Sequence, residues 1–207
     1  MFGVISLKVC QSNPLHFTSD FLQEATLDQH NEMELVQIKL EEATQNVSLV
    51  KILCAQRLDD DRAVLLLETE YLYFENFFWN TNDSKRLRQQ SSNLTEILNF
   101  TRNHLSRTLA FLGIVQMEED DRHLVETINT VYYKVRDVIA SCLLLAGQSP
   151  TDSKIPDIVP NALINKQNSL TSRHLRDYII ISTSQKIISD IRDIWRELGD
   201  EKNNSES

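Results

Sequence analysis

The stretch that decides the fold is LVETINTVYYKVRDVIASCLLL, residues 124–145. Its apolar residues recur at alternating steps of four and three, which is the spacing of one buried face of an α-helix. The positions on this face are Leu124, Ile128, Val131, Val135, Val138, Cys142 and Leu145. Gly147 follows the last of them, where a glycine commonly ends a helix. The pattern predicts a long amphipathic helix that packs against other helices.

Three further stretches carry the same spacing. One helix is predicted over about 31–58, on the face Val36, Leu40, Ala43, Val47, Val50 and Cys54. Asn31 and Glu34 resemble a capping box at its start, so a separate short helix is expected over 19–30. A second helix carries Leu94, Leu98, Leu105 and Leu112 and is expected to end at Gly113. The last, over about 172–198, carries Ile180, Ile187, Ile191, Ile194 and Leu198, with Tyr178, Ile181, Ile188 and Trp195 beside them.

The acids Asp59, Asp60 and Asp61 interrupt the first of these patterns. They suit the first turn of another helix over about 62–79, because the helix dipole favours negative charge there. One long kinked helix is the alternative.

Composition points to the same fold class. Glycine and proline occur only four times each in 207 residues, whereas sandwiches and barrels need many turn glycines. We therefore predict an all-α fold, an elongated bundle of four to five long antiparallel helices with short coiled-coil-like seams, in up-and-down order or as an array of helical hairpins. The expected divisions are an N-terminal extension at 1–17, a bundle at 18–199 with a proline-containing loop at 148–171, and a disordered polar tail at 200–207.

Charge and cysteine usage narrow the class of protein. A net charge of −9 argues against nucleic acid as the main partner. Three scattered cysteines suggest neither a disulfide framework nor a zinc site, so a reducing compartment fits best. Residues 1–10 do not resemble a signal peptide, and no run is apolar enough to span a membrane. The expected location is intracellular, in the cytoplasm or the nucleus.

The motifs of common enzyme chemistry are missing from the sequence. It contains no G-x-x-x-x-G-K or G-x-G-x-x-G phosphate loop and no G-x-S-x-G nucleophile elbow. Only Asp120 and His123 approach the E-x-x-H spacing of bundle metal sites, and Asp120 suits a helix cap. The carboxylate run at 118–121 is expected to be solvated, and His174-Leu175-Arg176-Asp177 is only a chance likeness to a kinase loop. Cys54 and Cys142 are expected in the core. We predict no catalytic residue, metal or cofactor.

An aromatic cluster is the first candidate for binding. Tyr73, Phe74, Phe77, Phe78 and Trp79, together with Tyr71, spread around too much of a helix for one packed face to hide them. Either this helix is central in the bundle, or the cluster contacts a partner, because aromatic residues dominate interface hot spots.

A basic zone is the second candidate. It consists of Lys85, Arg86, Arg88, Arg102 and Arg107, with only Glu96 opposing it. It could dock on an acidic partner or on phosphates, or it is an ordinary solvated face.

These features predict a non-enzymatic protein–protein interaction module, a helical adaptor or scaffold subunit of an intracellular complex. The expected partner is a helical protein in a hetero-complex, and the oligomeric state stays open. Two alternatives remain: a four-helix cytokine-like signal or ligand carrier, and a bundle enzyme of unrecognised type.

Overall fold

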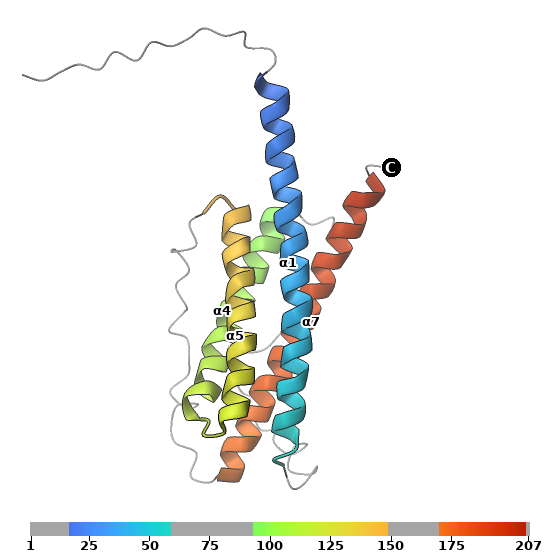
Figure 1. Cartoon of the computed structure of the whole chain (residues 1–207). Helices are drawn as coiled ribbons and strands as arrows, with labels where there is room; N and C mark the ends of the chain where they lie inside the picture. Colours follow the sequence, from blue (N-terminus) through green and yellow to red (C-terminus); the bar gives the residue numbers. More distant parts are fainter. Residues whose placement is uncertain (1–16, 59–92, 149–169, 206–207) are drawn as a thin grey trace, which may run out of the picture.

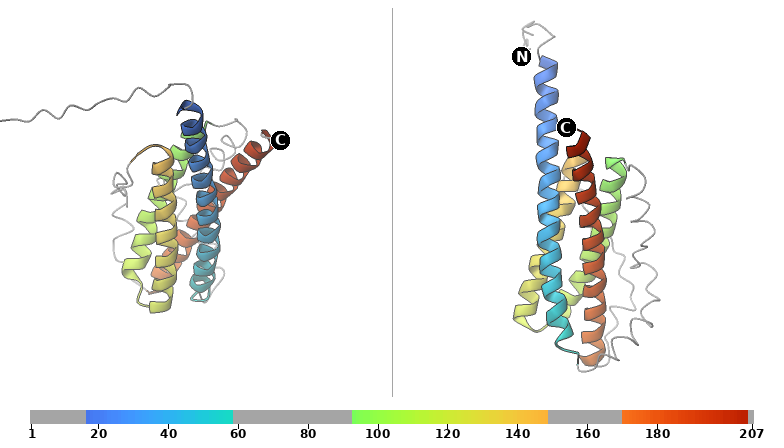
Figure 2. Two further views of the ribbon diagram at one scale, coloured as in Figure 1. Left: turned by 45° about the horizontal axis from the view of Figure 1, so that its top comes forward. Right: turned by 90° about the vertical axis from the view of Figure 1, so that its right-hand side faces the viewer.

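A computed structural model describes residues 17–58, 93–148 and 170–205, with side chains described at 31–58, 93–148 and 173–200. These ranges contain no strand and four long helices: α1 (Phe17–Ala55), α4 (Leu94–Glu118), α5 (Arg122–Leu145) and α7 (Leu170–Ser205). The helices form an elongated bundle, and the first turns of α1 project beyond the other three (Figures 1 and 2). The predicted all-α bundle is therefore confirmed. The helix expected at 62–79 lies outside the described residues.

The core consists of the apolar faces read from the sequence. All the predicted core positions are buried except Leu94, Leu145, Tyr178 and Leu198, which are partly buried and pack against the rest. The largest buried side chain is Trp195 of α7. A four-three spacing thus identified the buried face of each described helix correctly.

Helices α1 and α4 each pack against both α5 and α7, so α1 lies diagonally across the bundle from α4. Gln37, in the middle of α1, donates to the carbonyl of Trp195, in the second half of α7 (Nε2 to O, 2.7 Å). Arg57, just after α1, reaches Glu119 at the end of α4 (Nη1 to Oε2, 2.6 Å). Helices α1 and α4 therefore run in one direction and α5 and α7 in the other, so all packed neighbours are antiparallel (Figure 1).

The four described helices do not alternate in direction along the chain. The connection from α4 to α5, at the lower end in Figure 1, is a tight turn. The chain leaves α1 at the lower end and begins α4 at the upper end, and it leaves α5 at the upper end and begins α7 at the lower end. In chain order the four described helices therefore run down, down, up and up in Figure 1.

The start of α1 differs from the predicted start, whereas its end agrees with the prediction. Helix α1 is continuous from Phe17, so the separate helix over 19–30 and the capping box at Asn31 were wrong. No glycine or proline interrupts residues 17–33, and nothing local forces a break there. The predicted end before Asp59 is confirmed, because α1 ends at Ala55 and a turn follows to Leu58.

Two glycines expected to end helices lie inside them. Helix α4 continues past Gly113 to Glu118, because Ile114 and Val115 extend its buried face. Helix α7 continues past Gly199 to Ser205, so residues 200–205 are helical rather than a disordered tail. A Cβ atom on Gly199 would lie 2.5 Å from Nε2 of Gln37, so this glycine makes room for a contact between helices.

The ends of α5 follow local rules. Asp121 caps its start, accepting at Oδ1 from the backbone N–H groups of His123 (2.9 Å) and Leu124 (3.2 Å). Gly147, with φ of 67°, forms the predicted C-terminal cap. The N–H of Gln148 bonds the carbonyl of Leu143 (2.8 Å) and that of Gly147 bonds Leu144 (2.9 Å), as in a Schellman motif.

The same substitution at two glycines should have opposite effects. Gly113→Ala should raise the free energy of unfolding by about 0.5–1 kcal/mol, since an added Cβ meets nothing within 4 Å inside a helix. Gly147→Ala should lower it by about 1–2 kcal/mol, because alanine disfavours positive φ. Urea unfolding of the two variants beside the wild type measures both. A loss of stability in Gly113→Ala would show that α4 is not an ordinary helix there.

Candidate functional site

Most of the predicted binding residues lie outside the described residues. These are Tyr73, Phe74, Phe77, Phe78 and Trp79 of the aromatic cluster and Lys85, Arg86 and Arg88 of the basic zone. Arg102 and Arg107 lie on α4 and are partly buried. The Arg102 guanidinium donates to Gln148 Oε1 (2.8 Å) and Asn99 Oδ1 (3.3 Å), so it ties the start of α4 to the end of α5. Both candidate surfaces therefore stay predictions.

A different apolar surface is exposed on α1. Leu35, Ile38, Leu49 and Ile52 are 37–55% exposed although all four are large aliphatic residues. The two pairs are separated by about four helical turns, so all four side chains lie on one stripe on the side of α1 away from the core. We call these four residues the α1 outer stripe. Single exposed apolar residues are common, whereas four aligned on one helix are a feature of binding surfaces.

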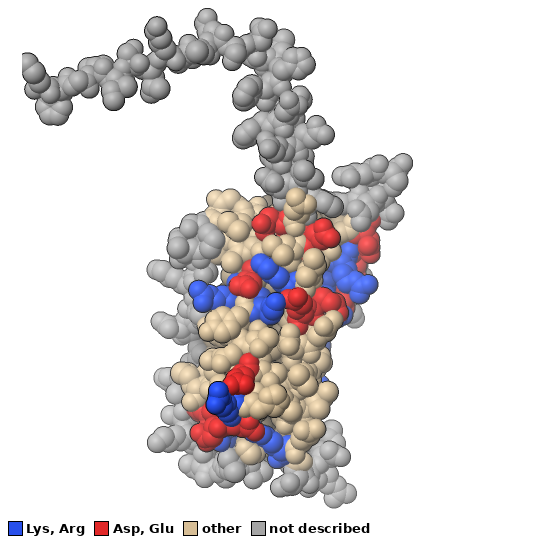
Figure 3. Space-filling model, viewed as in Figure 1, with Lys and Arg blue, Asp and Glu red and all other residues tan. Residues whose placement is uncertain are grey.

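Charged and uncharged regions alternate on the face of the bundle over α1 and α5. Figure 3 shows the face over α1 and α5, with charged side chains gathered in a band across its upper half and in a cluster at lower left. Charged groups on these helices form ion pairs: the Lys134 ammonium pairs with the carboxylate of Glu42, and Arg192 lies 3.6 Å from Glu41. Between the charged regions the surface over the lower part of α1, which carries Leu49 and Ile52, is mostly uncharged. An apolar partner surface could contact it with little desolvation of charge.

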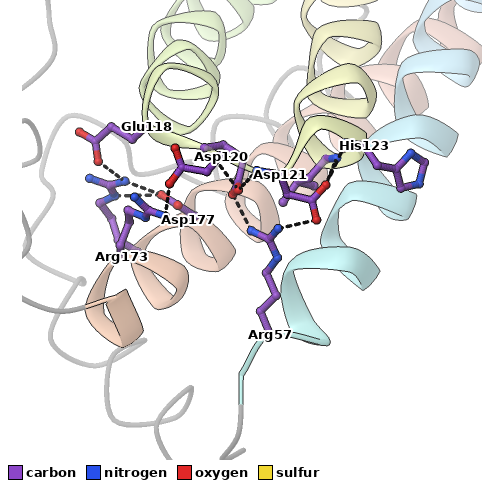
Figure 4. Close-up of polar contacts among 10 residues, drawn as sticks. Arg57, Glu118, Asp120, Asp121, His123, Arg173 and Asp177 are labelled. Atoms are coloured by element: carbon purple, nitrogen blue, oxygen red, sulfur yellow. Dashed lines mark hydrogen bonds and ion pairs between the residues drawn. The ribbon is translucent and has the colours of Figure 1, made fainter.

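The lower end of the bundle carries a network of ion pairs between four segments (Figure 4). Arg57, after α1, donates to Glu119 (2.6 Å) and to Asp121 (2.9 Å). Only 3% of the Glu119 side chain is exposed, so this pair is largely shielded from water. The bonds fix the end of α1 to the α4–α5 turn.

A second part of the network is centred on α7. Arg176 is 0% and Asp177 3% exposed. Oδ1 of Asp177 accepts from Nε (2.9 Å) and Nη2 (2.6 Å) of Arg176, and Nη2 also reaches Glu118 of α4 (2.8 Å). Arg173 pairs at 3.3 Å with Asp120, which is exposed. We call these groups, with Arg57, Glu119 and Asp121, the lower-end network.

The network shifts the pKa of several of its members. Burial raises the pKa of Asp177 to about 6, although the charge of Arg176 opposes the rise. The backbone N–H of Leu124 and the Arg57 guanidinium lower the pKa of Asp121. Burial, with the charges of Arg57 and Arg173, lowers the pKa of His174.

This network is not predicted from the sequence. The run 118–121 is predicted to be solvated, yet Glu119 is buried against Arg57, which lies far away in the sequence. No role is predicted for Arg176 and Asp177. A signal for their burial exists, because they lie four residues before Ile180 and Ile181 and therefore on the core face of α7.

The cysteines have the predicted packing role. Cys54 and Cys142 are both buried, and burial raises the pKa of each thiol to about 12, so neither is a reactive thiolate near neutral pH. Among the described residues no cluster of histidine, cysteine, aspartate and glutamate could hold a metal ion.

No helix within the described ranges combines the length and apolar character needed to cross a bilayer. Comparison with family models, with curated proteins and with solved structures gave no match to this chain.

Proposed function

We propose that this protein is a non-enzymatic helical bundle that binds another protein through the outer face of α1. The α1 outer stripe carries the proposal. Its four aliphatic side chains stay half-exposed on the side of α1 opposite its buried face, where they contribute little to the bundle core. The free energy gained by covering apolar surface, about 25 cal/mol per Å², would favour a partner with an apolar contact surface.

Two kinds of protein fit this description. The first is the helical adaptor or scaffold subunit of an intracellular complex. The second is a cytokine-like signalling ligand, and one observation favours it: the first two described helices run in one direction and the last two in the other, as in the up-up-down-down order of cytokine bundles. Fold alone does not determine function, so we keep the intracellular subunit as the competing proposal.

The test compares one double variant with a matched control. Leu49→Asp/Ile52→Asp places two charges on the lower half of the α1 outer stripe, and both side chains are exposed enough for the fold to tolerate them. Met117→Asp makes the same kind of change on α4, where Met117 is 81% exposed. Circular dichroism and the melting temperature should be close to wild type for both.

The tagged full chain and both variants are then offered to intact cells and, separately, to cell lysate, and captured proteins are cross-linked and identified. We expect wild type and Met117→Asp to capture one partner, and the double variant to capture at least about tenfold less, since one buried charge costs several kcal/mol. Capture on intact cells would support the signalling ligand, and capture only from lysate the intracellular subunit. Equal capture by the double variant would exclude the α1 outer stripe as the contact.

A further inference from the structure

Asp177 is a buried carboxylate whose two oxygens differ in their hydrogen bonding. Its Oδ1 accepts both bonds from Arg176, while Oδ2 is buried and has no hydrogen-bond partner among the described residues. A buried oxygen of an ionised carboxylate without a donor is costly, because it has lost the water that solvated it. A proton on Oδ2 removes that cost and leaves the bonds to Oδ1 in place.

Several titratable groups lie near Asp177. Glu118 and Glu119 act on it from the end of α4 and the turn, Cys54 from α1 and Arg176 from its own helix, while Arg57, Arg173 and His174 lie at the same end of the bundle. In the whole lower-end network three guanidinium groups face five carboxylates: Arg57, Arg173 and Arg176 against Glu118, Glu119, Asp120, Asp121 and Asp177. Asp120 and Asp121 are 89% and 49% exposed and therefore largely solvated, so the buried carboxylates that repel one another are Glu119 and Asp177.

We propose that Asp177 is a proton-binding site, and that the lower end of the bundle is held more firmly with this proton bound, at mildly acidic pH, than above neutrality. The lower-end network around this site joins the end of α1, the α4–α5 turn and α7. Proton binding there is a pH-sensitive device built into the fold. It is independent of whether the α1 outer stripe binds a partner.

The direction of the pH effect follows from linkage. Burial raises the pKa of Asp177 from 3.8 to about 6, so the folded protein binds this proton more tightly than the unfolded chain. The contribution of Asp177 to the free energy of unfolding therefore increases as pH falls through about 6, and it reaches its full value below about 4. His174 acts in the opposite direction, because its folded pKa is lowered. Asp121 loses stabilising bonds only at lower pH, since its pKa is also lowered.

The direct test is a ¹³C NMR titration of the side-chain carboxyl groups in the full chain. We expect one aspartate carboxyl to titrate with a midpoint near 6, and that signal to be missing from Asp177→Asn. A midpoint for Asp177 at or below about 4 would overturn the proposal, because that is the range of an ordinary aspartate.

A second test uses stability, with urea unfolding at several pH values. Relative to wild type, the folding equilibrium constant of Asp177→Asn should rise by at least about tenfold between pH 4.5 and pH 8, as one pKa unit corresponds to a factor of ten. Asp137→Asn on the exposed side of α5 is the control and should show no such rise. His174 is present in all three proteins, so its contribution cancels. A constant ratio for Asp177→Asn overturns the proposal, and if this variant does not fold, the titration of wild type decides.

Discussion

Arg176→Met should lower the free energy of unfolding by about 3–5 kcal/mol, the range for breaking a buried ion pair from one side. Arg176 is fully buried, and its guanidinium supplies both bonds to Oδ1 of Asp177 and one to Glu118. Methionine fills a similar volume but leaves two carboxylates without that donor. Urea unfolding at pH 7.5 measures the loss, and it should be smaller at pH 5, where Asp177 can take up a proton.

Two comparisons identify the cause of that loss. Arg176→Met/Asp177→Asn should recover much of the stability, because removing both charged partners of a buried pair is often nearly neutral. Arg122→Met is the matched control, since Arg122 is 92% exposed and pairs with Glu126 one turn away. It should leave stability almost unchanged. If Arg176→Met behaves like Arg122→Met, the buried pair does not stabilise the lower end.

The faces of the helices could be predicted because burial follows apolar spacing. Val135 and Leu112, read as core positions from the sequence, are completely buried. The buried face of a helix can be predicted without knowing which helix packs against it, because any apolar neighbour can cover that face. The same rule reports neither the direction of a helix nor which helices become neighbours. The directions of the described helices along the chain were therefore not predicted.

Helix ends were predicted less well because local signals compete with burial. Glycine costs a helix only about 1 kcal/mol relative to alanine, and burying Ile114 and Val115 outweighs that cost past Gly113. At Gly147 no buried face continues, and the glycine ends the helix as expected. A glycine therefore ends a helix where the apolar pattern ends as well.

The lower-end network and the α1 outer stripe could not be predicted from the sequence, for a different reason. Arg57 and Glu119 each resemble an exposed residue in the sequence, and only the packing of α1 beside the α4–α5 turn brings them together. Ile38 and Ile52 stood outside the predicted seam, and their exposure became informative once the neighbours of α1 were known. The aromatic cluster around Phe77 stays a prediction, since it lies outside the described residues.

Trp195→Ala should also cost about 3–5 kcal/mol, which is the range for deleting a large buried aromatic side chain. Trp195 is fully buried in α7, and its indole Nε1 donates to Thr101 Oγ1 of α4 (2.9 Å). Its backbone carbonyl accepts from Gln37 of α1. Alanine leaves a cavity where three helices meet. Because natural domains are stable by only about 5–15 kcal/mol, the melting temperature should fall steeply in a thermal scan followed by circular dichroism.

Conservative variants separate the packing of this ring from its hydrogen bond. Trp195→Phe keeps an aromatic ring but leaves the Thr101 hydroxyl without its donor, and Thr101→Val leaves the indole N–H without its acceptor. Each should cost about 1–3 kcal/mol, and the double variant should cost less than their sum, because no buried polar group is then left unpaired. Additive losses would mean that the Nε1 to Oγ1 bond contributes nothing. The free energy of unfolding lost in Trp195→Ala could instead be no larger than that lost in Trp195→Phe. Neighbouring side chains would then fill the space of the missing ring, and packing of this ring against α1 and α4 would not hold α7 in place.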